Sequence, residues 1–501
     1  MKETDIDRQR KLLSDRGICV VIPTYNNGGT IGDVVRQALQ ECADVIVVND
    51  GSTDDTSAVL HAIAGITLVE YQQNRGKGYA LKTGFRKAKE MGFAYAITLD
   101  GDGQHYPSEI GRFLEANRQH PGSLIIGNRN LVGVERSKGS NFANQFSNFW
   151  FYVQTGRRLA DTQTGYRLYP LHKLYGLSLL TSRYEAELEL LVFASWHGVK
   201  IVPIPIEVYY PPLGERVSHF RPGWDFFRIS VLNTILCVLA IIYGLPLRLY
   251  RLLAVVVRTV YSLLFFLIGC TCIMTPAAWL CVKIGKNEER KRRRLHQLIY
   301  HAARLVMIHH GIPGTRFSYK VSDKVSFDKP SVIICNHQSH LDLMCQLIFT
   351  PNMVFLTNNW VWNNKLYGQM IRNAEYYPVA EGIDELLPKL RSVVERGHHI
   401  AIYPEGTRSM DCQIARFHQG AFYIAEQLGL DIIPMCVYGP GKILPKKTYH
   451  LRKGPIYIEV GDPITQEQLR ALGDTKQQAS AMRKHYLQWY EQLSNQIDQH
   501  V

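Results

Sequence analysis

Short apolar runs alternate with longer amphipathic stretches through the first part of the chain. The runs are continuously apolar, as in strands of a parallel sheet covered on both faces. They are Ile18–Pro23, Asp44–Val48, Ile66–Tyr71, Ala94–Leu99 and Ser123–Ile126. The stretches with helical spacing between them are Thr30–Cys42, Asp55–Ala64, Lys77–Met91 and Ser108–Asn117. This alternation predicts an α/β domain with a mostly parallel sheet.

Two uncharged apolar runs, Ile229–Pro246 and Thr259–Val282, lie in the middle of the chain. As helices they are long enough, or nearly so, to cross ~30 Å of hydrocarbon. We expect a membrane-associated helical hairpin. Two full spans would place the arginines of the 248–258 turn outside, against the positive-inside tendency, so a re-entrant or in-plane arrangement is favoured by Pro246 and Pro276. A hairpin buried in a soluble protein is the alternative.

The two apolar runs and the turn between them are called the apolar belt below. A second α/β pattern follows this belt. Ser331–Cys335 is a short apolar strand that leads into a helix start, and Gln466–Gln499 is helical and polar. The sequence therefore predicts three parts, at residues 1–228, 229–289 and 290–501. A length of 501 residues is consistent with more than one core.

Charge and composition favour a membrane surface as the partner. The formal net charge is +13, and basic residues crowd the apolar belt, as in proteins attracted to anionic lipids. No nucleic-acid-binding motif is present, so we expect no nucleic-acid partner. Met1–Gly17 is charged, which predicts no signal peptide. We expect both flanking domains at the cytoplasmic face of the cell inner membrane. The ten scattered cysteines have no metal-ligand spacing, so reduced thiols are expected.

Polar clusters follow the predicted strands at their carboxyl ends, where ligands of parallel sheets bind. They lie at Pro23–Asn27, Asn49–Asp54, Asn74–Gly78 and Asp100–His105. Basic side chains and helix amides of the third cluster can hold phosphate. Asp100 and Asp102 can bind a divalent cation, and through it a diphosphate. Taken alone, the D-G-S-T-D run is most often a turn followed by a helix cap, and a D-x-D pair is a solvated loop at least as often as a metal site.

Five segments together resemble family 2 glycosyltransferases of the GT-A fold, close to the polyprenyl-phosphate and dolichyl-phosphate sugar synthases. They are P-T-Y-N-N, V-V-N-D-G-S-T-D, N-R-G-K-G-Y-A-L-K-T-G-F, L-D-G-D-G-Q-H-Y-P and I-G-N-R, within about residues 17–229. The resemblance implies that Asp50 lies at the nucleotide base, and that Asp100 and Asp102 hold Mg²⁺ or Mn²⁺. The nucleotide-sugar site that it implies comprises Pro23, Tyr25, Asp50, Lys77, Asp100 and Asp102. Asn49 departs from the family, which usually has Asp there.

The same resemblance implies acceptor contacts further along the chain. Arg129 belongs to I-G-N-R, and Arg167 to D-T-Q-T-G-Y-R, where it either binds an acceptor phosphate or forms a structural pair with an Asp. His219 and Arg221 lie in a basic block similar to that of bacterial lipid-phosphate glycosyltransferases. That block binds either the acceptor phosphate or lipid head groups.

We expect an inverting displacement, in which an acceptor oxygen attacks the anomeric carbon while the metal stabilises the leaving diphosphate. A phosphate acceptor is already ionised and needs little base assistance. A hydroxyl acceptor needs a carboxylate base, for which Glu187 or Asp102 is the candidate. Glu187 best matches the family's acidic residue, although solvated helical charge explains its neighbours Glu185 and Glu189 equally well.

The second half carries a different chemistry. His337 and Asp342 are spaced so that they can share a hydrogen bond, and an imidazole oriented by a carboxylate can take a proton from a hydroxyl. About sixty residues later, Glu405, Gly406 and Arg408 lie in P-E-G-T-R-S. Arg408 can hold a phosphate there, while Glu405 orients the site.

These blocks, with R-F-H-Q-G-A and I-I-P-M-C-V-Y-G, resemble glycerolipid acyltransferases of the lysophosphatidate type over about residues 290–490. The resemblance implies that His337 is the general base with Asp342 as its partner. The acyl donor would be acyl-CoA or acyl-ACP, with no covalent acyl-enzyme. Glu381 stands where the family has an acceptor-binding arginine, and His418 replaces a lysine. Both departures argue against simple lysophosphatidate as the acceptor.

The sequence thus predicts a bifunctional membrane-associated enzyme. One half transfers a sugar from a nucleotide-sugar to a lipid-linked acceptor, and the other acylates a hydroxyl of a lipid or glycolipid. A fusion would keep an insoluble intermediate at high effective concentration. Two alternatives stay open. The halves serve one lipid or polyene-pigment pathway without a shared intermediate, or the acyltransferase half is a degenerate lipid-binding module.

Overall fold

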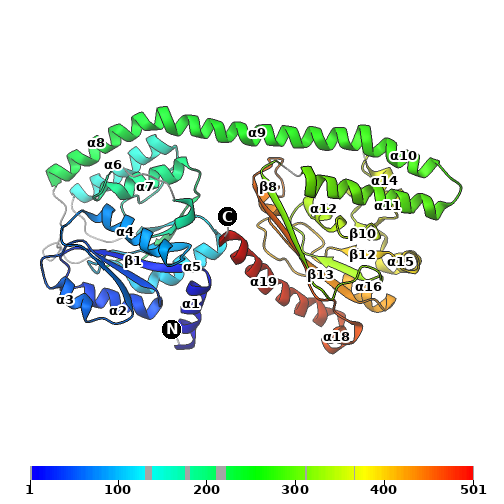
Figure 1. Cartoon of the computed structure of the whole chain (residues 1–501), viewed down its shortest axis with the longest axis horizontal. Coiled ribbons are helices and arrows are strands. Elements are labelled where there is room, and N and C mark those ends of the chain that lie inside the picture. The colour runs from blue at the N-terminus through cyan, green and yellow to red at the C-terminus, as the bar shows by residue number, and fades with distance from the viewer. Residues whose placement is uncertain are drawn as a thin grey trace. The chain divides into compact units, whose positions relative to one another are not determined.

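The computed structural model describes residues 3–129, 138–174, 181–209, 222–310, 313–365 and 367–499. The chain divides into two compact units, Met1–Arg251 and Leu252–Val501 (Figure 1). Each unit is built around one seven-stranded sheet, which confirms the expectation of two α/β domains. The boundary between the units falls inside the segment 229–289, and the three-part division remains a prediction.

The sheet of the first unit has the order β3-β2-β1-β4-β6-β5-β7. All neighbouring pairs are parallel except those of β6, which is antiparallel to both β4 and β5. The strands are β1 (Ile18–Thr24), β2 (Val45–Asn49), β3 (Ile66–Glu70), β4 (Tyr95–Thr98), β5 (Leu124–Arg129), β6 (Arg167–Pro170) and β7 (Ile201–Ile206). The five apolar runs predicted as strands correspond to β1 through β5.

Helices cover both faces of this sheet. Strand β1 shows why, because Val20 and Ile22 enter the core on one face while Cys19 and Val21 enter the core on the other. The helices are α1 (Glu3–Asp15), α2 (Ile31–Glu41), α3 (Thr56–His61), α4 (Lys77–Glu90), α5 (Ile110–Gln119), α6 (Lys138–Thr155), α7 (Glu185–Trp196) and α8 (Pro222–Leu239), with short 3₁₀ turns at Pro107–Glu109 and Leu171–Lys173.

The sheet of the second unit has the order β11-β10-β12-β9-β13-β14-β8. Its pairs are parallel apart from β13 with β14. The strands are β8 (Thr315–Val321), β9 (Val332–Cys335), β10 (Met353–Thr357), β11 (Tyr377–Pro378), β12 (His399–Ile402), β13 (Ile432–Tyr438) and β14 (Gly454–Val460). The strand predicted at Ser331–Cys335 is β9, at the centre of the sheet.

Helices of the second unit pack on both faces, and buried clusters lie on either side of β9. They are α10 (Thr275–Lys283), α11 (Glu288–Arg304), α12 (Leu341–Leu347), α13 (Asn359–Trp362), α14 (Gly368–Asn373), α15 (Ile383–Glu395), α16 (Gly420–Leu428), α17 (Pro440–Ile443), α18 (Gln466–Ala471) and α19 (Thr475–Gln499). A π-helical turn at Leu305–His310 and a 3₁₀ turn at Val379–Glu381 complete the unit.

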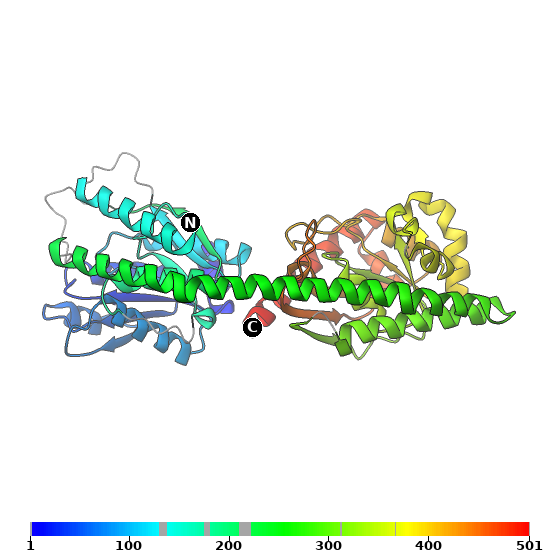
Figure 2. The ribbon, with the colours of Figure 1, turned by 90° about the horizontal axis from the view of Figure 1, so that it is seen from above.

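The apolar belt forms a single helix instead of the predicted hairpin. It runs without interruption from Phe226 to Lys283, through α8, α9 (Leu245–Ile268) and α10 (Figure 2). The prolines at 246 and 276 do not break it, because each follows a π-helical turn, at Ala240–Gly244 and Gly269–Met274. A widened turn rearranges the backbone hydrogen bonds that a proline otherwise disrupts. The two apolar runs therefore belong to one helix, and the expectation of a hairpin is wrong.

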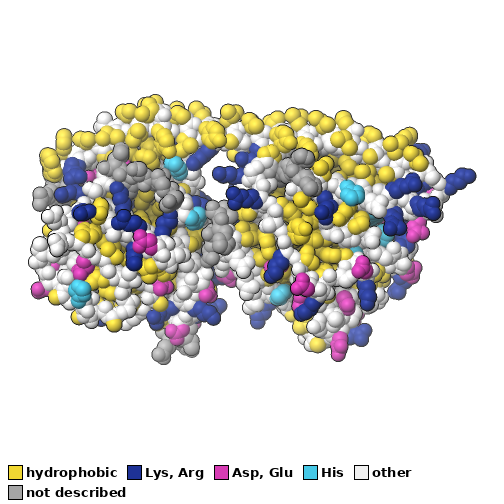
Figure 3. Space-filling view, viewed as in Figure 1, with side chains coloured by type: hydrophobic (Ala, Val, Ile, Leu, Met, Phe, Trp, Pro, Cys, Tyr) yellow, Lys and Arg dark blue, Asp and Glu magenta, His cyan; other side chains and the backbone are white. Residues whose placement is uncertain are grey.

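This helix is long and apolar enough to cross a membrane by length and composition, and only 6% of its most apolar window is buried. Apolar side chains gather along it in the space-filling view (Figure 3). They include large exposed residues such as Leu249, Leu253, Val257, Leu264 and Trp279. Exposed apolar surface on this scale marks an interaction surface rather than a solvated helix.

Candidate active sites

The polar clusters of the first unit meet at one edge of the sheet, as the sequence predicts. Pro23 lies near the end of β1 and Tyr25 just beyond it, while Asp50 follows β2. Asp100 and Asp102 follow β4. Since β2, β1 and β4 are parallel neighbours, their carboxyl ends lie side by side.

Asp50 is buried and orders the neighbouring loop. Its two carboxylate oxygens accept the backbone N–H groups of Arg75 and Gly76, at 2.9 Å and 2.8 Å. The loop that carries this carboxylate passes very close to the backbone of Asn74. A Cβ on Gly51, whose φ is +70°, would lie 2.6 Å from the Asn74 nitrogen. The contact of Asp50 with a nucleotide base stays a prediction.

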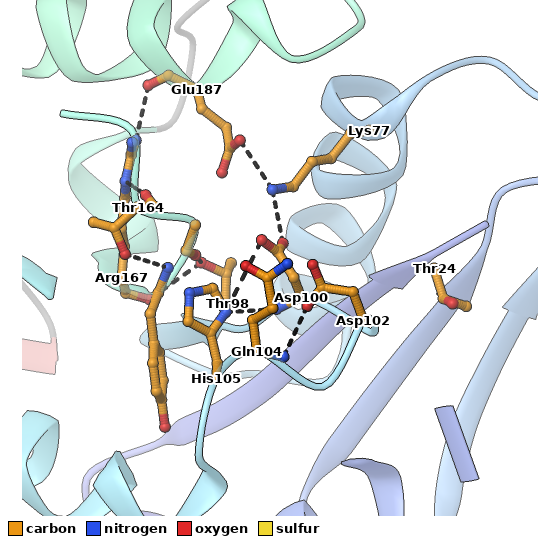
Figure 4. A network of polar contacts seen from close by, with 12 residues as sticks. Thr24, Lys77, Thr98, Asp100, Asp102, Gln104, His105, Thr164, Arg167 and Glu187 are labelled. Atoms are coloured by element: carbon orange, nitrogen blue, oxygen red, sulfur yellow. Dashed lines mark hydrogen bonds and ion pairs between the residues drawn. The ribbon is translucent and has the colours of Figure 1, made fainter. Parts of the chain in front are cut away.

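A lysine joins two carboxylates at the centre of this edge (Figure 4). Lys77 Nζ lies 2.7 Å from Asp100 Oδ1 and 3.0 Å from Glu187 Oε2. Lys77 begins α4, Asp100 follows β4 and Glu187 is in the first turn of α7. Burial alone would lower the pKa of Lys77, but the two carboxylates raise it well above its ordinary value.

The three glutamates of α7 have different partners. Glu185 forms an ion pair with Arg228, and Glu189 accepts from the backbone N–H and the hydroxyl of Thr181. Glu187 alone of the three reaches Lys77, and its Oε1 is buried without a partner among the described residues. The structure thus separates Glu187 from its neighbours, and its role as a base stays a prediction.

Asp102 carries a carboxyl group close to that of Asp100. Burial and the adjacent charge of Asp100 raise its pKa to about 6. Its Oδ1 accepts the backbone N–H of Gln104 at 3.0 Å. Two carboxylates that repel each other at a strand end fit a divalent cation, whose charge would relieve that repulsion. Among the described residues, no group of three His, Cys, Asp or Glu side chains forms a complete metal cage, so such a cation would also need ligands from the substrate or from water.

Glycines allow the chain to approach Asp100 closely. A Cβ on Gly165 would lie 2.6 Å from Asp100 Oδ2, so only glycine fits there without movement of the carboxylate. A Cβ on Gly101 would lie 2.9 Å from the hydroxyl of Thr24. The segment D-T-Q-T-G-Y-R is therefore packed directly against the aspartate that the sequence marks as a metal ligand.

The two predicted acceptor arginines lie in different settings. Arg129 forms two hydrogen bonds with the Asp161 carboxylate, at 2.6 Å and 2.9 Å. Arg167 is fully buried, and its guanidinium donates to the carbonyls of Thr162, Thr164 and Glu187 at 2.8 Å. The guanidinium of Arg167 thus joins its own D-T-Q-T-G-Y-R segment to α7, and it has no exposed surface for an acceptor phosphate, which favours the structural alternative. That structural partner is not an Asp, because Asp161 pairs with Arg129.

The other predicted acceptor residues of this half, His219 and Arg221, lie outside the described residues.

The second unit brings His337 and Asp342 together as predicted. His337 Nδ1 lies 2.9 Å from Asp342 Oδ2, and the same oxygen accepts the backbone N–H groups of Gln338 and Ser339. Asp342 is fully buried at the start of α12, whereas the His337 side chain is 20% exposed. A carboxylate held in this way fixes the ring with Nδ1–H toward Asp342, which leaves Nε2 as the acceptor.

Glu405 ties the P-E-G-T-R-S block to this histidine. One carboxylate oxygen accepts the His337 backbone N–H at 2.7 Å, and the other accepts that of Ala415 at 2.8 Å. Burial raises the pKa of Glu405. In the same block, the Gly406 backbone has φ +65°, and the partly buried Arg408 lies near His340, whose pKa is lowered by burial and by that arginine.

Two residues near the histidine carry roles that the sequence does not reveal. The Tyr403 ring stacks on the His337 imidazole with centroids 4.0 Å apart. Asn336 pairs with the backbone of Val437 on the next strand. In the sequence, Tyr403 directly precedes P-E-G-T-R-S and Asn336 directly precedes His337. These positions beside the motifs are the sequence feature by which both residues could have been found. Glu381, which stands in place of an acceptor arginine, forms an ion pair with Lys389 at 2.6 Å.

Comparison with known proteins matches one family model to each unit. The family model for glycosyl transferase family 2 matches residues 19–168, and the model for acyltransferase matches residues 316–438. A polyprenol monophosphomannose synthase of Mycolicibacterium smegmatis is 30% identical over 39% of this chain and 78% of its own length. A UDP-N-acetylglucosamine–dolichyl-phosphate N-acetylglucosaminyltransferase of Methanococcus voltae is 28% identical over 44% of this chain and 98% of its own length.

The second unit has relatives of another kind. A 1-acyl-sn-glycerol-3-phosphate acyltransferase of Chlamydomonas reinhardtii is 32% identical over 26% of this chain. The matched region spans 42% of that acyltransferase's length, so less than half of the relative is represented here.

Proposed function

Because the chain belongs to glycosyl transferase family 2 in its first unit and carries an acyltransferase domain in its second, we propose that it is a bifunctional enzyme of membrane lipid synthesis. The first unit transfers a sugar from a nucleotide-sugar to a lipid-linked acceptor, either a polyprenyl phosphate or another lipid. The second transfers an acyl group from acyl-CoA or acyl-ACP to a hydroxyl of a lipid or glycolipid.

The contact of Lys77 with both Asp100 and Glu187 supports the sugar transfer best. In this proposal Asp100 and Asp102 hold a Mg²⁺ or Mn²⁺ ion, which supplies positive charge to the leaving diphosphate when bound. Lys77 then provides a fixed positive charge at the same edge, and Glu187 lies within its reach. For a hydroxyl acceptor, Glu187 takes the proton. A phosphate acceptor arrives ionised and needs no base.

The hydrogen bond between His337 and Asp342 supports the acyl transfer best. His337 Nε2 takes the proton from the acceptor hydroxyl as its oxygen attacks the thioester carbon, while Asp342 stabilises the imidazolium. Arg408 binds the acceptor's or the donor's phosphate. The carrier's thiolate leaves and takes the proton back from the His337 imidazolium to become the thiol. The intact set of His337, Asp342, Glu405 and Arg408 disfavours the degenerate-module alternative, which has no use for an oriented imidazole.

The long apolar helix attaches the enzyme to the membrane in this proposal. Phe226–Lys283 contains 58 residues and would extend about 87 Å at 1.5 Å per residue, far more than the ~30 Å of the hydrocarbon core. The basic residues within it, such as Arg248, Arg251 and Arg258, favour a helix lying in the interface over one that spans it. Both units then act at the cytoplasmic face of the inner membrane.

Mass spectrometry of lipid extracts tests this function. Cells would express wild type, Asp102→Ala or His337→Ala, with the exposed Asp33→Ala and His301→Ala as matched controls. We expect His337→Ala to accumulate a glycolipid one acyl chain short, and Asp102→Ala to lose both species. If each variant loses a different, unrelated lipid, the two activities share no intermediate. Unchanged lipids in both variants would refute the proposed chemistry.

A further inference from the structure

A cavity of about 450 Å³ opens in the first unit away from the sugar-transfer site. It lies where α6 and α7 end and β7 begins, and its lining includes Arg157, Arg158, Gly198 and Lys200. The Lys200 carbonyl accepts the backbone N–H of Leu124, the first residue of β5. The cavity is therefore at the amino ends of β5 and β7.

The sugar-transfer residues occupy the opposite edge of the same sheet. Asp100 follows the carboxyl end of β4, and β4 and β5 run in the same direction because both are antiparallel to β6. The amino ends of β5 and β7 thus face away from the edge that holds Asp100. A ligand of the cavity would not compete with the nucleotide-sugar.

The long helix adds two further cations to this cavity's border. A Cβ on Gly156 would lie 3.4 Å from an Arg248 guanidinium nitrogen, and a Cβ on Gly198 would collide with the Arg251 guanidinium. Glycine at both positions gives the guanidinium groups room beside the backbone. Three cations therefore line the cavity, and two more lie beside glycines at its border. The five are Arg157, Arg158, Lys200, Arg248 and Arg251.

Hydrogen bonds hold these cations without neutralising them. Arg157 donates to the Val199 carbonyl at 3.0 Å, and Arg251 donates to the Trp196 carbonyl at 2.6 Å. The ion pairs formed among the described residues include none of the five cations. Their positive charge is therefore left for a ligand or for solvent.

Nearby titratable groups respond to this charge. Burial lowers the pKa of Arg157, and Arg248 and Arg251 lower it further. The pKa of His120 is lowered by burial and by Lys200, and that of His197 by burial and by Arg251. The positive potential is thus concentrated at the cavity, where an anion would relieve it.

Apolar side chains are exposed on the two helices that border the cavity. Tyr152, whose ring lies beneath the Arg158 guanidinium, and Val153 are exposed on α6. Leu249 and Tyr250 are exposed on the long helix between Arg248 and Arg251, at 56% and 69%. An anion with an apolar body matches this combination better than a free ion, because the cations bind its charge and the exposed side chains contact its chains.

We propose that this cavity binds the phosphate group of an anionic membrane lipid, at a site separate from both catalytic centres. The inference rests on the proposed attachment of the long helix to a membrane. The site would add a charge-dependent contact with the membrane to the apolar contact that the long helix makes. It would set how firmly the first unit holds to a membrane that contains acidic lipids.

Vesicle flotation of the full-length protein tests the site. The vesicles contain phosphatidylcholine alone or phosphatidylcholine with phosphatidylglycerol. The variant is Arg157→Gln/Lys200→Gln, and the matched control is Arg36→Gln/Arg86→Gln, which removes two exposed charges elsewhere in the unit. We expect the cavity variant to lose roughly tenfold or more of the phosphatidylglycerol-dependent partition, and the control to keep it. Binding to phosphatidylcholine alone should be unchanged in both.

Three other outcomes would contradict the proposal. Equal losses in the two double variants would show general attraction of basic residues and would overturn the site. Inorganic phosphate could compete at a concentration equal to that of the lipid phosphate while the vesicles themselves show no effect. That result would assign the cavity to free phosphate instead of lipid. Absence of binding to either vesicle type by wild type would refute the membrane attachment itself. Arg158→Gln, a single change of an exposed side chain, repeats the test if the double variant fails to fold.

Discussion

The side-chain amide of Asn336 is paired with both backbone groups of Val437. Its Nδ2 donates to the Val437 carbonyl at 2.9 Å, and its Oδ1 accepts the Val437 N–H at 2.7 Å. Asn336 is fully buried and directly precedes His337. The pair continues the hydrogen bonding between β9 and β13 past the point where β9 ends, so the histidine leaves the sheet from a fixed position.

Asn336→Asp should therefore destabilise the second unit. An aspartate keeps the shape but cannot donate to the Val437 carbonyl, and it buries a charge. We expect the free energy of unfolding to fall by about 2–3 kcal/mol, as measured by chemical denaturation. The exposed Asn359→Asp serves as the control. Equal stability of the two variants would mean that the amide pair contributes nothing.

Asp342→Asn tests the orientation of His337. One oxygen, Oδ2, accepts all three N–H groups, so an amide oxygen in its place can keep these bonds, but the amide carries no negative charge. We expect kcat for acyl transfer to fall on the order of 10³-fold with little change in KM, since the imidazolium formed when Nε2 takes the proton loses its stabilising charge. Sugar transfer by the same preparation should be unchanged. The exposed Asp323→Asn should behave as wild type.

Gly165→Ala tests the close approach to Asp100. The added Cβ would lie 2.6 Å from Asp100 Oδ2 and must displace that carboxylate or the loop. We expect sugar transfer from a labelled nucleotide-sugar to drop on the order of 10²-fold, and half-saturation by Mg²⁺ or Mn²⁺ to shift to higher concentration. Gly29→Ala is the control, because no atom lies within 4 Å of its Cβ position. Full activity of Gly165→Ala would contradict the packing described.

Arg167→Lys separates the structural role from acceptor binding. A lysine cannot reach the carbonyls of Thr162, Thr164 and Glu187 together. We expect the first unit to lose about 3 kcal/mol of unfolding free energy. A variant with unchanged stability and a raised KM for the lipid acceptor would instead support the acceptor-phosphate role.

His296 should make stability depend on pH. Burial lowers its pKa to about 4 in the folded protein, against about 6.5 when unfolded. Between these values the unfolded chain binds the extra proton, so stability is lost as pH falls. From pH 7 to pH 5 this group should cost about 2 kcal/mol. Thermal unfolding of His296→Gln should show a smaller drop over that interval than wild type, and an identical drop would contradict the assignment.

The sequence predicts the strands that are apolar along their whole length. Runs such as Ile18–Pro23 and Ser331–Cys335 sit at the centre of a sheet, where both faces are buried. Strand β6 is not predicted, because it begins with the charged Arg167. Its burial depends on a carbonyl of α7, at Glu187, as well as on the nearby carbonyls of Thr162 and Thr164. Likewise, the long helix continues past Pro246 and Pro276 because π-helical turns precede them. No residue pattern in the sequence predicts these turns.

In the candidate sites, too, contacts between residues close in sequence could be predicted, and contacts between distant residues could not. The spacing of His337 and Asp342 predicts their hydrogen bond because five residues bring both into one strand-to-helix turn. The Tyr403–His337 stack joins residues that are far apart in sequence, and only the packing of β12 beside β9 reveals it. In the first unit the carboxylates were predicted, but the partition of Glu185, Glu187 and Glu189 among three partners required the fold.

The last helix reaches back to the strands that carry the histidine. Tyr486, fully buried in α19, donates its single hydroxyl proton between two acceptors, the carbonyls of Ile334 and Met435, each at 3.0 Å. On a ribosome, β9 emerges long before this tyrosine. The acyltransferase geometry is therefore completed only after α19 has been made, whereas all strands of the first unit's sheet are made before it. Nascent chains should thus acquire the two activities in order, sugar transfer before acyl transfer.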